Sequence, residues 1–156
     1  MQNYIKSQTR LAFVQFIFQN EFSKTDSLES IDEFQKHFYD TNIAIIDEKK
    51  EIKLKFNKNF LNKLFNSLQN KIDKKNIIED LNRFIDINRK FEKWDNILKS
   101  IIFAIIAELL ITEKNKFKIV FNDYLNISKS LVSQKETKLI NAIIQKYIDK
   151  DEIDKK

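Results

Sequence analysis

The chain has no glycine, no proline and no cysteine among its 156 residues. Without glycine it lacks the backbone turns on which P-loops, dinucleotide fingerprints, nucleophile elbows and standard EF-hand loops depend. Without cysteine it has no disulfide bond, no thiolate metal site and no cysteine nucleophile. These absences exclude whole classes of nucleotide, calcium and redox sites. The absence of cysteine also fits a reducing compartment without proving one.

Long apolar runs are missing as well. The longest uninterrupted run covers residues 101–107, far short of the roughly 20 residues that a membrane-spanning helix needs. The N-terminus has no apolar stretch of the kind found in secretory signals. We therefore expect a cytoplasmic protein that does not enter a membrane, with the apolar run buried in a core helix.

Basic residues outnumber acidic ones, at 28 against 23, for a net charge of +5. Almost all are lysine, and the chain is also rich in isoleucine, asparagine and phenylalanine, a bias typical of AT-rich coding. Part of the lysine content therefore reflects mutational background. The net charge still attracts polyanions weakly, whatever its origin.

Apolar residues recur at intervals of three and four along most of the chain, which predicts amphipathic helices. The expected helices cover residues 7–21, 27–39, 60–68, 76–87, 94–109, 120–131 and 133–149. The helix at 94–109 is apolar over most of its circumference, as expected for the central helix of a bundle. We predict an all-α, single-domain bundle of about seven helices over residues 1–149, followed by a polar, disordered tail at 150–156.

Capping boxes mark three of these helix starts: Asp26 with Glu29, Asn76 with Glu79, and Ser133 with Glu136. Because glycine is absent, asparagines near the helix breaks are the residues best able to adopt the left-handed conformation at helix ends. We expect them to do so, at positions 20, 70, 88 and 115.

The stretch from residue 43 to 56 is ambiguous. Ile52, Leu54 and Phe56 alternate with lysines, as in a strand. A two-stranded ribbon would have to pack on helices to persist. We predict an irregular segment here, with a short hairpin as the alternative.

Few residues suggest catalysis or metal binding. Glu108 is the one carboxylate inside an apolar stripe, and we expect it to be a buried hydrogen-bonding group. His37 is the only histidine, and a metal site needs several convergent ligands. We therefore predict no catalytic residue, no metal and no cofactor.

Two groups of basic residues could contact phosphates. Lys6 and Arg10 lie one helical turn apart in the first predicted helix, and Lys129, Lys135 and Lys138 surround the junction of the last two. For each lysine, an ordinary solvated surface is the alternative.

The C-terminal segment at 116–149 resembles the last two helices of the NusB family, bacterial transcription antitermination factors. Residues 118–123 correspond to the family's Lys-Val-x-Ile-Asn-Glu segment, Ser128 and Lys129 to its Ala-Lys pair, and residues 139–144 to its Phe-Val-Asn-Gly-Val-Leu segment. Glu108 falls in the family's Tyr-Glu-Leu, and residues 9–18 resemble its opening helix. Two departures are Phe103, where arginine is usual, and Ala142, which replaces glycine.

This resemblance implies a helical protein that pairs with NusE, a ribosomal small-subunit protein, and binds boxA RNA in nascent ribosomal transcripts within the transcription complex. It places the RNA contacts at Lys6, Gln8 and Arg10, with the group at Lys129, Lys135 and Lys138 as a second candidate. The family's N-terminal helix usually carries more arginines than this one.

For the protein partner, the resemblance points to Phe18 and Phe22, although both could instead belong to the core. A homodimer also stays open, because relatives include dimers and monomers. The main alternative function is a NusB-fold interaction module with weak or lost RNA binding. The NusB-like domain of rRNA methyltransferases is disfavoured because no methyltransferase domain follows.

Overall fold

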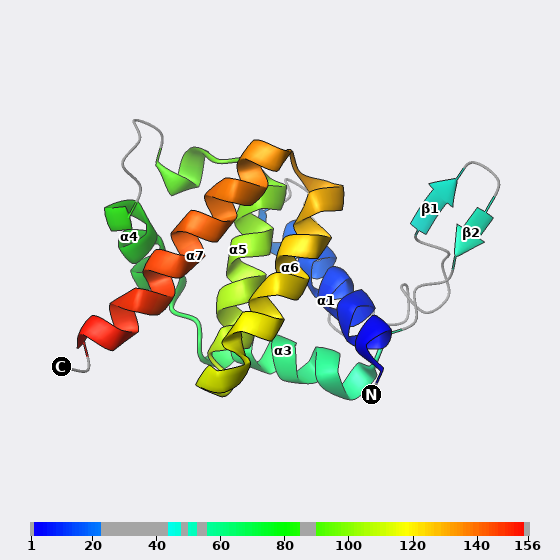
Figure 1. Ribbon diagram of the computed structural model, residues 1–156, viewed down its shortest axis with the longest axis horizontal. Coiled ribbons are helices and arrows are strands. Elements are labelled where there is room, and N and C mark those ends of the chain that lie inside the picture. The colour runs from blue at the N-terminus through cyan, green and yellow to red at the C-terminus, as the bar shows by residue number, and fades with distance from the viewer. Residues whose placement is uncertain (1, 23–43, 48–49, 53–55, 85–89, 155–156) are drawn as a thin grey trace.

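The computed structural model describes residues 2–22, 44–47, 50–52, 56–84 and 90–154. Within them the chain forms six α-helices (Figure 1): α1 (Asn3–Ile17), α3 (Lys58–Asn70), α4 (Lys74–Phe84), α5 (Asn96–Leu109), α6 (Phe117–Leu131) and α7 (Gln134–Asp154). Short helical segments lie at Phe18–Phe22, Phe91–Lys93 and Lys114–Lys116. The all-α prediction is confirmed. The predicted helix at 27–39, its cap at Asp26 and Glu29, and His37 lie outside the described residues.

Helix α5 is the centre of the bundle. It contacts α1, α3, α6 and α7, and every residue from Ile101 to Leu109 is buried. In Figure 1 it lies between α7 on the left and α6 on the right. A helix that is apolar around its circumference gains free energy only when it is covered on all sides. The prediction of a central helix at 94–109 is confirmed, although the helix itself begins at Asn96.

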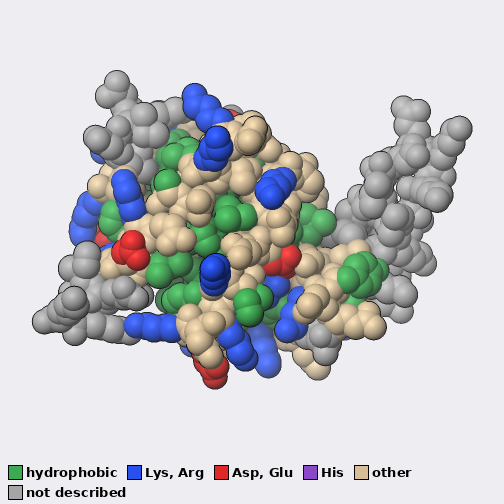
Figure 2. Space-filling model, in the orientation of Figure 1, with side chains coloured by type: hydrophobic (Ala, Val, Ile, Leu, Met, Phe, Trp, Pro, Cys, Tyr) green, Lys and Arg blue, Asp and Glu red, His purple; other side chains and the backbone are tan. Residues whose placement is uncertain are grey.

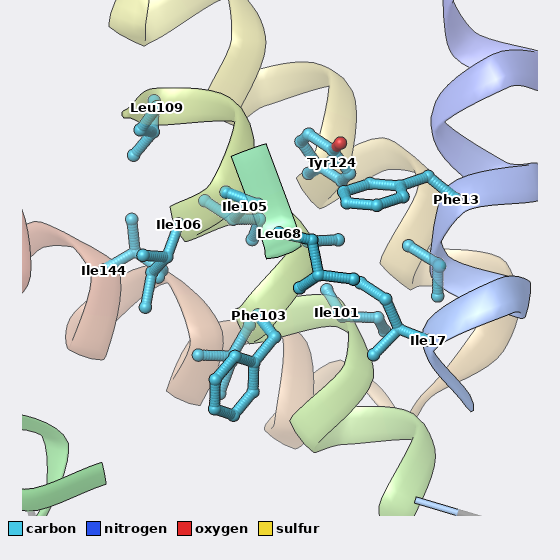
Figure 3. Packing of buried hydrophobic residues seen from close by; sticks show 14 of the residues in the cluster. Phe13, Ile17, Leu68, Ile101, Phe103, Ile105, Ile106, Leu109, Tyr124 and Ile144 are labelled. Carbon is cyan, nitrogen blue, oxygen red and sulfur yellow. The ribbon is translucent and has the colours of Figure 1, made fainter. Parts of the chain in front are cut away.

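The core joins side chains from all six α-helices, and Figure 3 shows part of it. Phe13 of α1 lies beside Tyr124 of α6, and Ile106 of α5 faces Ile144 of α7. Phe103, which replaces the arginine usual in the NusB family, is 1% exposed and packs against Phe91 with ring centroids 5.8 Å apart. Burying such a side chain contributes roughly 1.5–3 kcal/mol. An arginine would need a polar partner at this place, whereas phenylalanine needs none.

Side-chain caps mark the starts of α3, α4 and α7. Ser133 accepts a hydrogen bond from the backbone N–H of Glu136 at 3.1 Å, and the Glu136 carboxylate accepts one from the Ser133 N–H at 3.1 Å. This capping box is confirmed. Within the described residues no backbone has a positive φ, so the expected left-handed asparagines are not found there.

The cap predicted for α4 was wrong by one turn. Asp73 accepts the backbone N–H of Asn76 at 3.3 Å and its side-chain amide at 2.9 Å, and the helix already begins at Lys74. Asp73 is the better cap because its charged carboxylate also complements the positive helix end. Asn57 caps α3 in the same way, accepting from Phe60 N–H at 2.9 Å.

The ambiguous stretch at 43–56 contains a hairpin, so the prediction of an irregular segment is corrected in favour of its alternative. Strands β1 (Ala44–Asp47) and β2 (Lys50–Ile52) pair antiparallel, with Ala44 opposite Ile52 and an irregularity in register after Ile45. The β-branched isoleucines of these segments favour extended backbone.

Both terminal helices differ from their predicted bounds. Helix α1 starts four residues earlier than expected, and residues 18–22 wind as a π-helix rather than continuing it. Helix α7 extends past Asp149 to Asp154. Lys150 forms an ion pair with Asp80 of α4 and lies over the Tyr147 ring at 5.7 Å. The helix therefore continues past residue 150, where the tail was predicted to begin. The ion pair of Lys150 holds this part of α7 against α4.

Candidate nucleic-acid interface

Arg10, a predicted RNA contact, is buried at the meeting point of α1, α5 and α6. Its side chain donates to Glu108 from Nε, at 2.9 and 3.1 Å to the two carboxylate oxygens, and from Nη2 at 2.7 Å. Nη1 donates to Asp123 at 2.6 Å. The guanidinium carbon also lies 5.4 Å from the centroid of the Phe60 ring, and the residue is 7% exposed. Two carboxylates therefore occupy this guanidinium, and its predicted contact with RNA stays a prediction.

The carboxylates belong to one hydrogen-bonded cluster. Tyr124 donates its hydroxyl to Glu108 at 2.9 Å, and Ser7 donates to Asp123 at 2.7 Å. Glu108 is 3% exposed, so the prediction that it is a buried hydrogen-bonding group is confirmed. With an arginine and a phenol as donors, it is satisfied without solvent.

The surroundings shift two pKa values in this cluster. Burial alone would lower the pKa of Arg10, but the hydrogen bonds and negative charges of Glu108 and Asp123 outweigh it and raise that pKa above its usual range. Burial raises the pKa of the Tyr124 hydroxyl, and the negative charge of Glu108 raises it further. The cluster is therefore a permanently charged arginine held by carboxylates beside a neutral phenol, an arrangement suited to structural support.

The rest of the N-terminal group lies nearer the surface. Lys6 and Gln8 are each partly exposed on the first turns of α1. Tyr4, one turn before Gln8, is 51% exposed. Because Arg10 is buried, Lys6 is the cation of this group that a phosphate could reach.

The second predicted group is better exposed. Lys129, Lys135 and Lys138 all lie at the surface. Lys129 donates to Asn126 at 3.3 Å, and Lys129 and Lys138 line one groove of about 390 Å³ between α6 and α7. Lys135 is not part of its lining. The structure thus brings two of the three lysines to one surface feature.

A neighbouring groove of about 350 Å³ continues between the same two helices. It shares Asn122 and Asn141 with the first and adds Lys114 and Lys118, which sequence reasoning missed. The available signal was the four-residue spacing from position 114 through 118 and 122 to 126, which places these polar residues on one helical face. In Figure 2, basic side chains are spread over the face that α6 and α7 form, with few acidic ones.

The two predicted groups do not form one site. Figure 1 shows the start of α1 at one end of the bundle and the turn between α6 and α7 at the other. Lys6 therefore lies apart from Lys129 and Lys138. A ligand that reached both groups would have to cross the face of α6.

The predicted partner contacts are only partly described. Phe18 begins the π-helix that follows α1 and is half-buried. This segment contacts α5. Phe22 ends the same segment, and its side chain lies outside the described residues. The alternatives for Phe18, core or partner surface, both remain open.

Across the described part of the chain, no helix is both long enough and apolar enough to span a membrane. The same residues contain no group of three or more histidine, cysteine or acidic side chains that could hold a metal ion.

The NusB family model matches residues 7–149, from Ser7 within α1 to Asp149 within α7. The chain belongs to the NusB family. Similar proteins include the "Transcription antitermination protein NusB" of Rickettsia conorii, 26% identical over 141 residues, and that of Rickettsia massiliae, 25% identical over the same length. In each case the alignment covers 90% of this chain and 89% of the relative. No solved structure matches the chain.

The NusB match includes the Arg10 cluster and both grooves. The resemblance in the sequence motifs therefore extends over nearly the whole chain, middle region included. Among the predicted RNA contacts, the structure separates the buried Arg10 from lysines that are partly or fully exposed.

Proposed function

We propose that this NusB-family chain acts in transcription antitermination, binding boxA-type single-stranded RNA of nascent ribosomal transcripts together with NusE in the cytoplasm. Family membership and the names of its relatives support this role. The observation that carries the RNA part is the groove between α6 and α7, lined by Lys129 and Lys138. The net charge of +5 acts in the same direction.

The proposed mechanism is binding without catalysis. Exposed ammonium groups neutralise phosphates and release counterions, a contribution that is independent of base sequence. Sequence is read by hydrogen bonds to the edges of unpaired bases. Lys6 and Gln8 would contact the RNA at the start of α1, and Lys129, Lys135 and Lys138 at the other end of the bundle.

In this proposal Arg10 acts indirectly. By joining α1 to Glu108 of α5 and Asp123 of α6, it keeps the first helix and the groove-forming helix at a constant separation. A single RNA strand could then meet both basic groups without rearranging the protein. Preorganisation of this kind lowers the entropic cost of binding.

NusE is proposed as the protein partner, with Phe18 and Phe22 as contacts. Phe18 is half-buried. An aromatic ring that is packed on one side and open on the other can anchor an interface, which supports this assignment. A homodimer through the same surface is the competing arrangement. Sedimentation of the chain with and without NusE distinguishes them, because NusE would dissociate a dimer that used this surface.

The test is a titration of boxA-containing RNA with this chain, with and without NusE, at two salt concentrations and against a scrambled RNA. We expect tighter, boxA-selective binding when NusE is present. Equal binding of both RNAs would contradict sequence-specific antitermination.

The second candidate is a NusB-fold interaction module that no longer binds RNA. The burial of Arg10 favours it, because the N-terminal group then has only Lys6 as an exposed cation. Binding of NusE without binding of either RNA in the same titration would establish this candidate.

A further inference from the structure

The two grooves between α6 and α7 form one track. Polar and basic residues follow the groove side of α6 from Lys114, just before its start, to Lys129 near its end. On α7 the facing residues run from Lys138 to Gln145. At 1.5 Å per residue, the 15 residues from Lys114 to Lys129 span roughly 22 Å. Asn122 and Asn141 line both grooves and so mark their junction.

The track has no acidic lining. Its walls carry four lysines and no carboxylate: Lys114, Lys118, Lys129 and Lys138. Asp123 is the one acidic residue of α6, and its hydrogen bonds with Ser7 and Arg10 turn it to the side where α1 lies. Glu136, near the other end, is engaged in the cap of α7. Because Asp123 faces Arg10, the charged residues that line the opposite side of α6 are all lysines.

Carboxamides lie between these lysines. Asn122, Asn141 and Gln145 are exposed and line the track. In the part of the chain that the structure describes, none of the three side chains has a hydrogen-bond partner. Each can offer one acceptor and two donor positions to a ligand. Beside them Phe117 is half-buried, so part of its ring is open to a planar group.

We propose that a single RNA strand lies along this whole track, from the end at Lys129 and Lys138 to Lys114 and Lys118. The lysines bind phosphates, Phe117 stacks on a base, and the carboxamides of Asn122, Asn141 and Gln145 hydrogen-bond to base edges. This inference rests on the proposed RNA-binding function. It adds a second half to the site, in which base recognition occurs on α7.

Charge complementarity and the spacing of donors favour RNA over an acidic peptide. Phosphates repeat along a strand, as the lysines do along the track, and the unpaired base edges between them match carboxamides that both donate and accept. An acidic peptide would satisfy the lysines. It would leave the carboxamides to an extended backbone.

The first experiment removes the distal cations. A double Lys114→Ala, Lys118→Ala variant is compared with a matched Lys63→Ala, Lys71→Ala variant, which removes the same charge from exposed positions in α3 and at its C-terminal end. Affinity for an 18-nucleotide boxA RNA with NusE present is measured from 50 to 300 mM salt. Two lost phosphate contacts reduce the slope of log affinity against log salt by about 1.4, at roughly 0.7 for each contact with a single strand.

We expect this reduction for the α6 variant and none for the α3 control. Equal slopes for the two variants would overturn the track while leaving the proposed function intact. Failure of the unaltered chain to bind any RNA would overturn both.

The second experiment tests base recognition. An Asn141→Ala, Gln145→Ala variant should lose about tenfold in discrimination between boxA and scrambled RNA, with its salt slope unchanged because no phosphate contact is removed. Unchanged discrimination would contradict the assigned role of the carboxamides. The same variants are titrated with a fluorescein-labelled 16-residue peptide of alternating aspartate and leucine. Loss of peptide binding with RNA binding unaffected would make the track a peptide site and overturn the proposal.

Discussion

Arg10 and Glu108, 98 residues apart in the chain, form a buried pair in which three donor contacts of one guanidinium meet both oxygens of one carboxylate. Neither residue is more than 7% exposed. The pair ties the first helix to the centre of the bundle, and Asp123 extends the tie to α6. Its consequences for stability can be measured separately from RNA binding.

Replacing Arg10 by alanine should lower the free energy of unfolding by about 3–5 kcal/mol, because Glu108 would remain buried with only Tyr124 as donor. Urea denaturation followed by circular dichroism measures the change. An Arg10→Lys variant serves as comparison, since lysine retains the charge but cannot make the forked contact. A loss below 1 kcal/mol for Arg10→Ala would show that the pair contributes little to the fold.

Removing both charges should be tolerated far better than removing one. An Arg10→Met, Glu108→Leu double variant leaves no unpaired ion in the core, and apolar replacements of buried ion pairs are often neutral or stabilising. We expect its free energy of unfolding to exceed that of Arg10→Ala by at least about 2 kcal/mol. If the double variant is as unstable as the single one, the loss of packing, and not the orphaned charge, is the cause.

Tyr124 should make stability depend on alkaline pH. Its hydroxyl has a pKa above the ordinary value near 10 because it is buried beside Glu108. Above about pH 10 the unfolded chain releases this proton while the folded chain retains it, so stability falls as pH rises. The Tyr124→Phe variant lacks this contribution. The difference between the two proteins in urea denaturation should shrink from pH 9 to pH 11, and a constant difference would contradict the assignment.

The cap at the start of α7 should be worth about 1 kcal/mol. Ser133→Ala removes the acceptor for the Glu136 N–H and the hydroxyl that donates to the Glu136 carboxylate, which keeps only the backbone N–H of residue 133. Thermal unfolding measures the loss. Ser130→Ala is the matched control, because that hydroxyl donates only to a carbonyl within α6, that of Ile127. Equal losses in the two variants would mean that the capping box contributes nothing specific.

Lys6→Ala should reduce the salt slope of boxA RNA binding by about 0.7, the contribution of one phosphate contact with a single strand. Arg10→Lys should leave that slope unchanged, since Arg10 is occupied by Glu108 and Asp123. Fluorescence anisotropy at several salt concentrations provides both values. An unchanged slope for Lys6→Ala would remove the start of α1 from the RNA surface.

Patterns local to one element were the ones that sequence reasoning could predict. The periodic apolar residues located the described helices, the apolar run at 101–107 identified the central helix, and Ser133 with Glu136 marked the start of α7. The cap of α4 was misplaced, because Asp73 and Asn76 are both good capping residues and the choice between them depends on where the helix packs. The hairpin at 44–52 was uncertain for a similar reason, since alternation over so few residues does not decide between strand and coil.

The amino-acid sequence by itself determined that this protein is a helical bundle of the NusB type, because helical periodicity, capping residues and family motifs are all local properties of the chain. Only the tertiary structure decided which of its basic residues are buried. In the sequence, Arg10 lies one helical turn from Lys6, a spacing that suits phosphate contacts. Glu108 and Asp123 come within hydrogen-bond distance of Arg10 only after α1, α5 and α6 pack together. The basic track is likewise a product of packing, since α6, with Lys114 before it, forms one wall and α7 the other.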